Sequence, residues 1–189
     1  MKDKTKMLTF TALFAVLNFI AFTYGKINIP ISVGGTTAIH VANAVVVLSS
    51  WLLGPVYGGL AGAVGLSLAD VLDPLYISSA PKTFILKYCI GYISGKTAER
   101  LGLREKSEKK DITVAAALSA AAGLCFNVIF DPVIGYLFKR FVLGMPAKAA
   151  SILLTWTAGV TAFNALVCVF ISTALYLALH KAFFRISGK

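Results

Sequence analysis

Residues 36–76 contain two apolar runs that are separated only by Leu53-Gly54-Pro55. Proline is favoured in the first turn of a helix, so we expect one helix to end at Leu53 and another to begin at Pro55. Two helices joined by so short a turn run antiparallel, and their far ends reach the same level. Polar residues gather at those far ends, which predicts a helical bundle with a polar chamber near one surface.

The composition indicates that this bundle lies in a membrane. Hydrophobic residues make up 58% of the 189 positions and charged residues 14%, with a mean hydropathy of +0.81. Soluble domains are about one quarter charged. The first apolar run, Met7 to Tyr24, is too long for a cleavable signal peptide, and no small-residue cleavage site follows it. We predict a single all-α, polytopic membrane domain over residues 1–189.

The chain contains six apolar runs, and about 20 apolar residues are needed for each crossing, so six transmembrane helices are expected. Their approximate ranges are 7–25, 38–53, 55–73, 82–103, 112–130 and 149–184. The second is short for a full crossing, and the sixth is long enough to emerge from the bilayer. The fifth either ends at Phe130 or continues past Pro132 with a kink.

The cations predict the orientation. Basic residues prefer the cytoplasmic side, and most of the 18 lysines and arginines fall there if the N-terminus is cytoplasmic. Both termini are therefore predicted to be cytoplasmic. The net charge of +10 is attributed to contact with anionic lipid rather than with nucleic acid.

Small residues predict how the helices pack. Gly54, Gly58 and Gly62 recur every four residues and therefore share one face of the third helix. Membrane helices associate through such faces, so this helix is expected at the centre of the bundle. Thr11 and Ala15 form a smaller face on the first helix, which serves either internal packing or the docking of a partner protein.

Ionisable residues within the spans are functional candidates, because burying them in a membrane is costly. Asp70 and Lys87 are expected at similar depth near the outer surface, given a rise of about 1.5 Å per residue. Either they form an ion pair, or Lys87 contacts a bound solute.

Polar and aromatic residues cluster at the same depth, as is typical of a pocket for a flat, polar, heterocyclic molecule. The predicted substrate-binding residues are His40, Asn43, Lys87, Tyr88, Asn127, Asp131 and Trp156. The external segment 26–37, which contains Gly34-Gly35, is interpreted either as a lid over this pocket or as a plain connector.

The sequence contains no P-loop, HExxH or GxSxG motif. Cys89, Cys125 and Cys168 lie singly within apolar runs, which favours small core residues over disulfides or metal ligands. We therefore predict no catalytic residue, no metal and no bound cofactor, and we do not expect an enzyme.

Residues 39–95 resemble the S component of an energy-coupling factor (ECF) transporter, the vitamin-binding membrane subunit of this class of ABC importer. The similarity lies in His40, in the Leu-Gly-Pro-x-x-Gly turn at Leu53, in Ala69-Asp70 and in Lys87. The resemblance implies a bundle of six helices in the bacterial cell membrane. It also implies a transmembrane coupling protein and two cytoplasmic ABC ATPases as partners, with ATP used by those ATPases.

Two positions depart from the pattern of this branch. The branch commonly has His-x-Gly-Asp at the positions of residues 40–43, and here Ala42-Asn43 stand in place of Gly-Asp. Asn43 thus removes a negative charge near the pocket. Thr11-x-x-x-Ala15 stands where Ala-x-x-x-Ala docks on the coupling protein in such subunits. The resemblance implies that Thr11 and Ala15 dock there, and that the subunit reorients in the membrane to release its vitamin inside.

The predicted function is thus capture of a water-soluble vitamin or vitamin precursor from outside. Hydroxymethylpyrimidine or pyridoxine is favoured by the aromatic and amide groups, while riboflavin, pantothenate and cobalamin stay open. The alternatives are a membrane-embedded enzyme of lipid or prenyl metabolism and a stand-alone channel or secondary transporter. The outward position of the acidic residues disfavours the enzyme, and the absence of a clear internal repeat disfavours the transporter.

Overall fold

The computed structural model describes residues 2–187, which are mostly helical. The elements are α1 (Lys2–Tyr24), β1 (Lys26–Ile31), β2 (Gly35–His40), α2 (Ala42–Leu53), α3 (Pro55–Val71), η1 (Ile77–Ser79), α4 (Ala80–Arg100), α5 (Lys109–Leu137), η2 (Phe138–Val142) and α6 (Ala147–Ser187). The element η1 is a 3-10 turn, and η2 is a π-helical turn that follows α5 directly.

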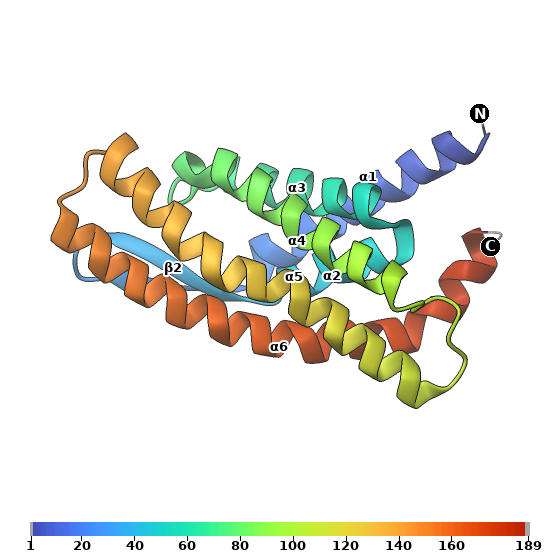
Figure 1. The fold of residues 1–189 in the computed structure, drawn as a ribbon. Helices are drawn as coiled ribbons and strands as arrows, with labels where there is room; N and C mark the ends of the chain where they lie inside the picture. The colour runs from blue at the N-terminus through green and yellow to red at the C-terminus, as the bar shows by residue number, and fades with distance from the viewer. Residues whose placement is uncertain (1, 188–189) are drawn as a thin grey trace.

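The six α-helices of this range form an elongated bundle (Figure 1). Helices α5 and α6 pack along each other, α4 packs on α5, and α3 contacts α1, α2 and α4. Both chain ends lie at one end of the bundle, together with the α2–α3 turn and the α4–α5 loop. The turn of the β1–β2 hairpin and the α3–α4 and α5–α6 connections lie at the opposite end.

Glycines allow α3 to approach its three neighbours closely. A Cβ atom on Gly58 would lie 2.2 Å from the Cα of Ser50 on α2. A Cβ atom on Gly65 would lie 2.2 Å from the carbonyl oxygen of Ala15 on α1. Any larger residue would force the helices apart. The central place predicted for α3 is nevertheless wrong, because α2 contacts all five other helices of the described range, whereas α3 packs on α1, α2 and α4.

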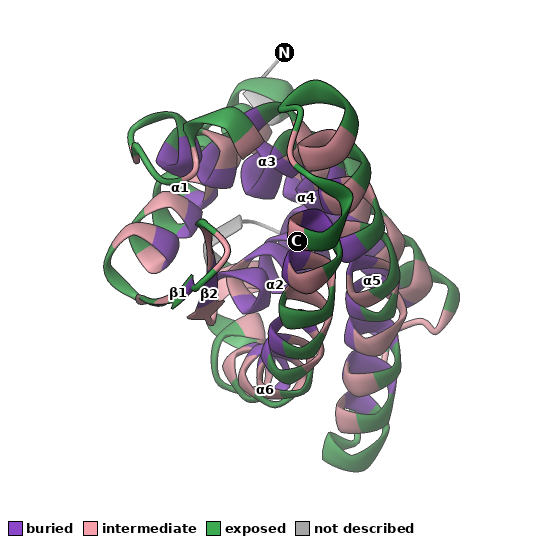
Figure 2. Ribbon diagram, turned by 90° about the vertical axis from the view of Figure 1, so that its left-hand side faces the viewer, coloured by how far each residue is buried: buried purple, intermediate pink, exposed green. Residues whose placement is uncertain are grey.

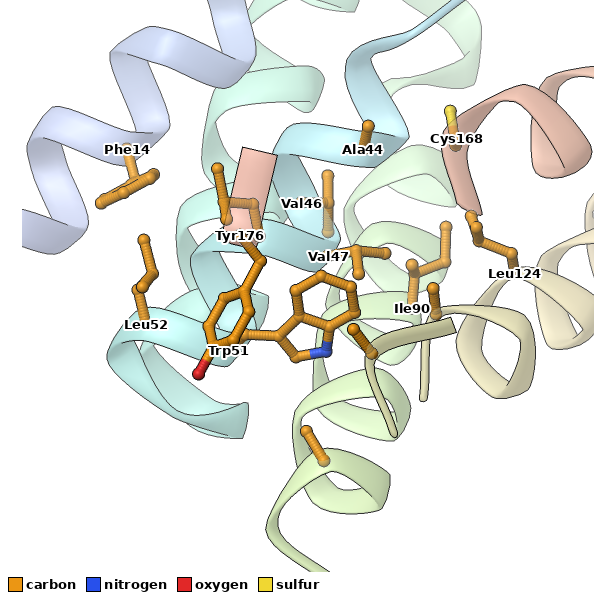
Figure 3. Close-up of a cluster of buried hydrophobic side chains, with 14 of the residues drawn as sticks. Phe14, Ala44, Val46, Val47, Trp51, Leu52, Ile90, Leu124, Cys168 and Tyr176 are labelled. Atoms are coloured by element: carbon orange, nitrogen blue, oxygen red, sulfur yellow. The ribbon is translucent and has the colours of Figure 1, made fainter. Parts of the chain in front are cut away.

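The largest buried side chains lie beside the α2–α3 turn. Trp51 and Tyr176 are each 1% exposed, and their rings meet edge to face with 5.4 Å between centroids (Figure 3). Arg104 Nε donates a hydrogen bond to the carbonyl oxygen of Trp51 at 2.9 Å. This apolar cluster closes the bundle at the end that carries the termini.

Residues 26–40 form an antiparallel hairpin rather than a loop and the start of a helix. Lys26 pairs with His40 and Ile31 with Gly35, and the turn contains Gly34 at φ +79°. Glycine adopts such a positive φ without steric cost. The predicted start of the second helix at residue 38 was wrong, because α2 begins at Ala42.

The other helices lie near their predicted ranges. Helix α5 runs through Pro132 to Leu137, which agrees with the longer of its two interpretations. Three helical segments, 4–24, 109–142 and 147–185, are long and apolar enough to cross a membrane, whereas the apolar helices α2 and α3 are shorter. The number of helices agrees with the prediction, and six complete crossings stay a prediction.

Helix α2 is buried nearly throughout, and burial divides the other helices into an inner and an outer face (Figure 2). Large apolar side chains are exposed on the outside, such as Leu13 at 52%, Leu166 at 65% and Phe170 at 75%. Soluble monomers rarely expose large contiguous apolar surfaces. The exterior therefore suits contact with lipid tails.

Candidate substrate-binding site

A polar cavity lies in the half of the bundle opposite the termini. It contains about 760 Å³ of space not filled by protein atoms, counting its open mouth. Its wall is built from α1, β2, the five helices α2–α6, η2 and the α3–α4 connection. Because residues from so many elements meet here, the site exists only in the folded bundle.

Three buried polar atoms of the cavity wall lack hydrogen-bond partners among residues 2–187. They are Nδ1 of His40 at the end of β2, Oδ1 of Asn43 in α2 and Oδ1 of Asn127 in α5. Buried polar groups are normally hydrogen-bonded, since leaving them unpaired costs free energy. Three residues of the cavity wall thus carry a polar atom whose capacity for hydrogen bonding is unused within the described residues.

The two cavity carboxylates are held by neighbouring side chains. Asp131 accepts a hydrogen bond from Lys82 Nζ at 2.6 Å and one from Thr161 Oγ1 at 3.3 Å. Asp70 accepts a hydrogen bond from Thr83 Oγ1 at 2.6 Å. Asp70 thus connects α3 to α4, and Asp131 connects α5 to both α4 and α6.

Lys87 differs from Lys82, because its ammonium has no hydrogen-bond or ion-pair partner among the described residues. Its side chain lines the cavity and is 8% exposed, and it makes no hydrogen bond or ion pair with any residue that the structure describes. The ion pair with Asp70 that one interpretation expected is not formed within 4 Å. Asp70 instead uses Thr83 as its donor.

Asn164 of α6 holds the hairpin against the bundle. Its Oδ1 accepts from the backbone N–H of His40 at 3.2 Å, and its Nδ2 donates to the carbonyl oxygen of Ala38 at 3.0 Å. On the other side, the ring of Phe22 in α1 meets the imidazole of His40 edge to face, with 5.0 Å between centroids. The strand β2 is thereby fixed as one wall of the cavity.

A second set of contacts ties the hairpin to the α3–α4 connection. Lys26 in β1 forms an ion pair with Asp73, and Tyr76 donates a hydrogen bond to Asn28 Oδ1 at 2.8 Å. The hydrogen bond from Lys26 lowers the pKa of Asp73 below its ordinary value. Burial, together with the nearby negative charge of Asp73, raises the pKa of Tyr76.

Five of the seven predicted substrate-binding residues line the cavity. They are His40, Asn43, Lys87, Asn127 and Asp131.

Tyr88 and Trp156 lie elsewhere. Tyr88 packs on Gly59 and stacks on Tyr92, and Trp156 is 51% exposed in a shallow apolar groove on the outside of α6. Tyr88 follows the cavity residue Lys87, and Trp156 precedes the cavity residue Thr157. Successive residues of a helix point about 100° apart, so a neighbour of a cavity residue points elsewhere.

Several cavity residues were not among the predicted substrate-binding residues: Lys82, Lys139, Thr157, Thr161 and Asn164. A signal existed in the spacing: Thr157, Thr161 and Asn164 share one face of α6 at intervals of four and three residues. The same interval relates the cavity residues Thr83 and Lys87 of α4.

The predicted docking residues lie on the side of α1 that faces α3. Thr11 is half-buried and bonds through Oγ1 to the carbonyl oxygen of Met7 at 2.8 Å. Ala15 is also half-buried, and its carbonyl lies beside Gly65. Docking by this face stays a prediction.

Comparison with known proteins agrees with this architecture. The model of the family described as "ECF-type riboflavin transporter, S component" matches residues 2–181. A crystal structure of the S component for biotin from an ECF-type ABC transporter has a TM-score of 0.61 and 21% sequence identity, with 92% of each chain covered. That likeness shows the fold, and no curated protein sequence matches significantly. Since the family model spans nearly the whole chain, the protein belongs to the family of ECF-type riboflavin transporter S components, which are transporter subunits and not enzymes.

Proposed function

We propose that this chain captures a water-soluble vitamin outside the cell as the substrate-binding subunit of an ECF-type importer. The observation that carries the proposal is the cavity, which presents unpartnered buried groups of His40, Asn43 and Asn127 within the S-component fold. Pockets for small molecules use a few placed polar groups in this way.

The substrate is proposed at the level of its class. The description of the family model names riboflavin, and that of the similar crystal structure names biotin. Both are water-soluble vitamins. The earlier preference for hydroxymethylpyrimidine or pyridoxine depended in part on the rings of Tyr88 and Trp156, which lie outside the cavity. That preference has no support in the structure or in the family match.

The direction of transport follows from charge and topology. Basic residues concentrate at the end of the bundle that carries the termini, and basic residues prefer the cytoplasm. We therefore infer that the termini are cytoplasmic and that the cavity opens outward. Release to the inside would require a coupling protein and two ATPases, which would use the ATP.

Isothermal titration calorimetry of the purified full-length protein with a vitamin panel tests the proposal. Trp fluorescence is a poor readout, because Trp51 lies in the apolar core and Trp156 lies outside the cavity. We expect one vitamin to bind tightly, and Asn127→Leu to weaken that binding by at least about tenfold through loss of a buried hydrogen bond. Trp156→Phe is the matched control and should bind normally.

Co-purification separates the proposal from its alternatives. A tagged chain should retain a coupling protein and two ATPases from its host membrane, and uptake should require ATP. Uptake by the chain alone, without these partners, would show a secondary transporter instead. Failure of every vitamin to bind would contradict the proposed function itself.

A further inference from the structure

The cavity carries more cationic than anionic side chains. Lys82, Lys87 and Lys139 line it, against Asp70 and Asp131. Lys82 is neutralised by Asp131 at 2.6 Å. Once that pair is set aside, two ammonium groups face one carboxylate, and neither ammonium forms an ion pair within residues 2–187.

Lys87 is the most informative of these cations. It is more than nine-tenths buried and lies in the cavity wall, one helical turn from Thr83. A buried ammonium is costly unless an opposite charge and hydrogen-bond acceptors compensate it. Asp70 forms no ion pair with Lys87, and the side-chain hydrogen bond that its carboxylate accepts comes from Thr83.

Lys139 adds positive charge close to Lys82. A Cβ atom built on Gly135 would lie 3.6 Å from Lys82 Nζ and 4.0 Å from Lys139 Nζ, so the two ammonium groups lie above the same turn of α5. The Lys139 side chain makes no ion pair within the described part of the chain. Because Lys82 is paired with Asp131, the charge of Lys139 is the one left over here, and the cavity wall screens it less than water does.

We propose that the ligand of this cavity carries an anionic group, a carboxylate or a phosphate, that pairs with the Lys87 ammonium. The unpartnered atoms of His40, Asn43 and Asn127 bind its uncharged polar part. This inference rests on the proposed function and narrows its substrate class. A neutral vitamin would leave the buried ammonium of Lys87 without a direct ion-pair partner.

Matched pairs of probes that differ in charge test the inference by calorimetry on the full-length protein. The anionic probes are biotin, pantothenate, riboflavin 5′-phosphate and pyridoxal 5′-phosphate; the uncharged partners are biotinamide, panthenol, riboflavin and pyridoxal. We expect an anionic probe to bind, and its uncharged partner to bind at least about 30-fold more weakly, as for loss of a buried charge pair. The pair that binds distinguishes a carboxylate from a phosphate.

Variants of Lys87 provide the second arm. Lys87→Met should lower affinity for the anionic probe by a similar factor and abolish discrimination within the pair, whereas Lys87→Arg should retain part of both. Circular dichroism and gel filtration check that each variant is folded. The comparison of anionic and uncharged probes uses the wild-type protein, so it tests the inference even if a variant does not fold.

The outcomes separate the two proposals. If an uncharged probe such as riboflavin binds as tightly as its anionic partner, the anionic class is overturned and vitamin capture stands. If Lys87→Met folds and keeps full affinity for the anion, the role of Lys87 is overturned. If no probe of either charge binds, the proposed function fails, and this inference fails with it.

Discussion

Asn164 is the residue that joins the hairpin to the helix bundle. It is 4% exposed and bonds the backbone of both His40 and Ala38. Substitution Asn164→Leu keeps the number and branching of the side-chain heavy atoms but leaves these two backbone groups without their side-chain partner. We expect the free energy of unfolding to fall by about 1–2 kcal/mol and vitamin binding to weaken, as measured by thermal unfolding in detergent and by calorimetry.

Thr155→Val is the control for Asn164→Leu. Thr155 is exposed on the same helix and bonds only within it, to the carbonyl oxygen of Ser151 at 3.2 Å. Its loss should change the unfolding temperature little. An unfolding temperature for Asn164→Leu equal to that of the wild type would show that the hairpin does not depend on this contact.

At the residue scale, the sequence predicted which polar types would matter better than which way they point. His40, Asn43, Lys87, Asn127 and Asp131 were predicted because polar groups within apolar runs are conspicuous, and all five line the cavity. Tyr88 and Trp156 were chosen for their depth in the membrane. The depth of a residue in the membrane does not determine which way its side chain points, because successive residues of a helix are rotated by about 100° about its axis.

Helix α3 depends on glycine at its contact with α2. In Gly58→Ala the new methyl would meet the backbone of Ser49 and Ser50, at 2.6 Å and 2.2 Å, so the helices must separate. Such overpacking costs about 1–3 kcal/mol of the free energy of unfolding. A lower unfolding temperature in detergent is the expected result.

Gly159→Ala is the matched control on α6. No atom lies within 4 Å of its would-be Cβ, and alanine is the better helix former, so stability should be unchanged or slightly higher. If Gly58→Ala were as stable as Gly159→Ala, the close approach of α2 and α3 would not contribute to stability.

The contact between Lys26 and Asp73 predicts how the hairpin responds to acid. The pKa of Asp73 is lowered in the folded state, so the ion pair stabilises the hairpin above the ordinary pKa of about 3.9 and is lost as the pH falls through the lowered value. Hydrogen exchange of the hairpin amides, corrected for the intrinsic effect of pH, should therefore be slow near neutrality and accelerate on acidification.

Asp73→Asn removes the charge and serves as the comparison. Its hairpin should already exchange faster at neutral pH and should lack the acid-dependent step. An identical pH dependence in wild type and Asp73→Asn would assign the acid response to another group.

At the element scale, the hairpin was the feature that sequence periodicity failed to predict. Its strands have six residues each, and Pro30 and two adjacent glycines suggested a loop. The hairpin is contacted by Asn164 and Asp73, which are distant in the sequence, and no local pattern reveals these contacts. The helices were predicted better, because long apolar runs in a membrane have few alternatives to a helix.

The hairpin also explains how so short a helix as α2 fits into the bundle. Twelve residues of helix span about 18 Å, well below the thickness of about 30 Å of the hydrocarbon core. Strand β2 precedes α2 and adds about 20 Å at 3.3 Å per residue. Irregular backbone is tolerated at this depth where protein covers it, as β1 and α6 do here.

At the scale of the whole molecule, the polar cavity and the apolar core occupy opposite ends of the bundle. The cavity lies opposite the termini, and the apolar core around Trp51 fills the end that carries them. The predicted docking residues Thr11 and Ala15 do not line the cavity, so we expect variants that disrupt docking and leave ligand binding intact.

The docking face of α1 provides that test. Thr11→Leu and Ala15→Leu add bulk where a coupling protein is predicted to pack, so the tagged chain should retain less than about a tenth of the wild-type ATPases, as for loss of about 1.4 kcal/mol. Vitamin affinity should stay normal, because neither residue lines the cavity. Because Thr11 and Ala15 are half-buried, a larger residue there could also disturb packing within the bundle. Ala12→Leu changes an exposed neighbouring position and separates docking from internal packing. Leu166→Trp on the outside of α6 is the control. Normal assembly and uptake in all three α1 variants would exclude this helix as the docking surface.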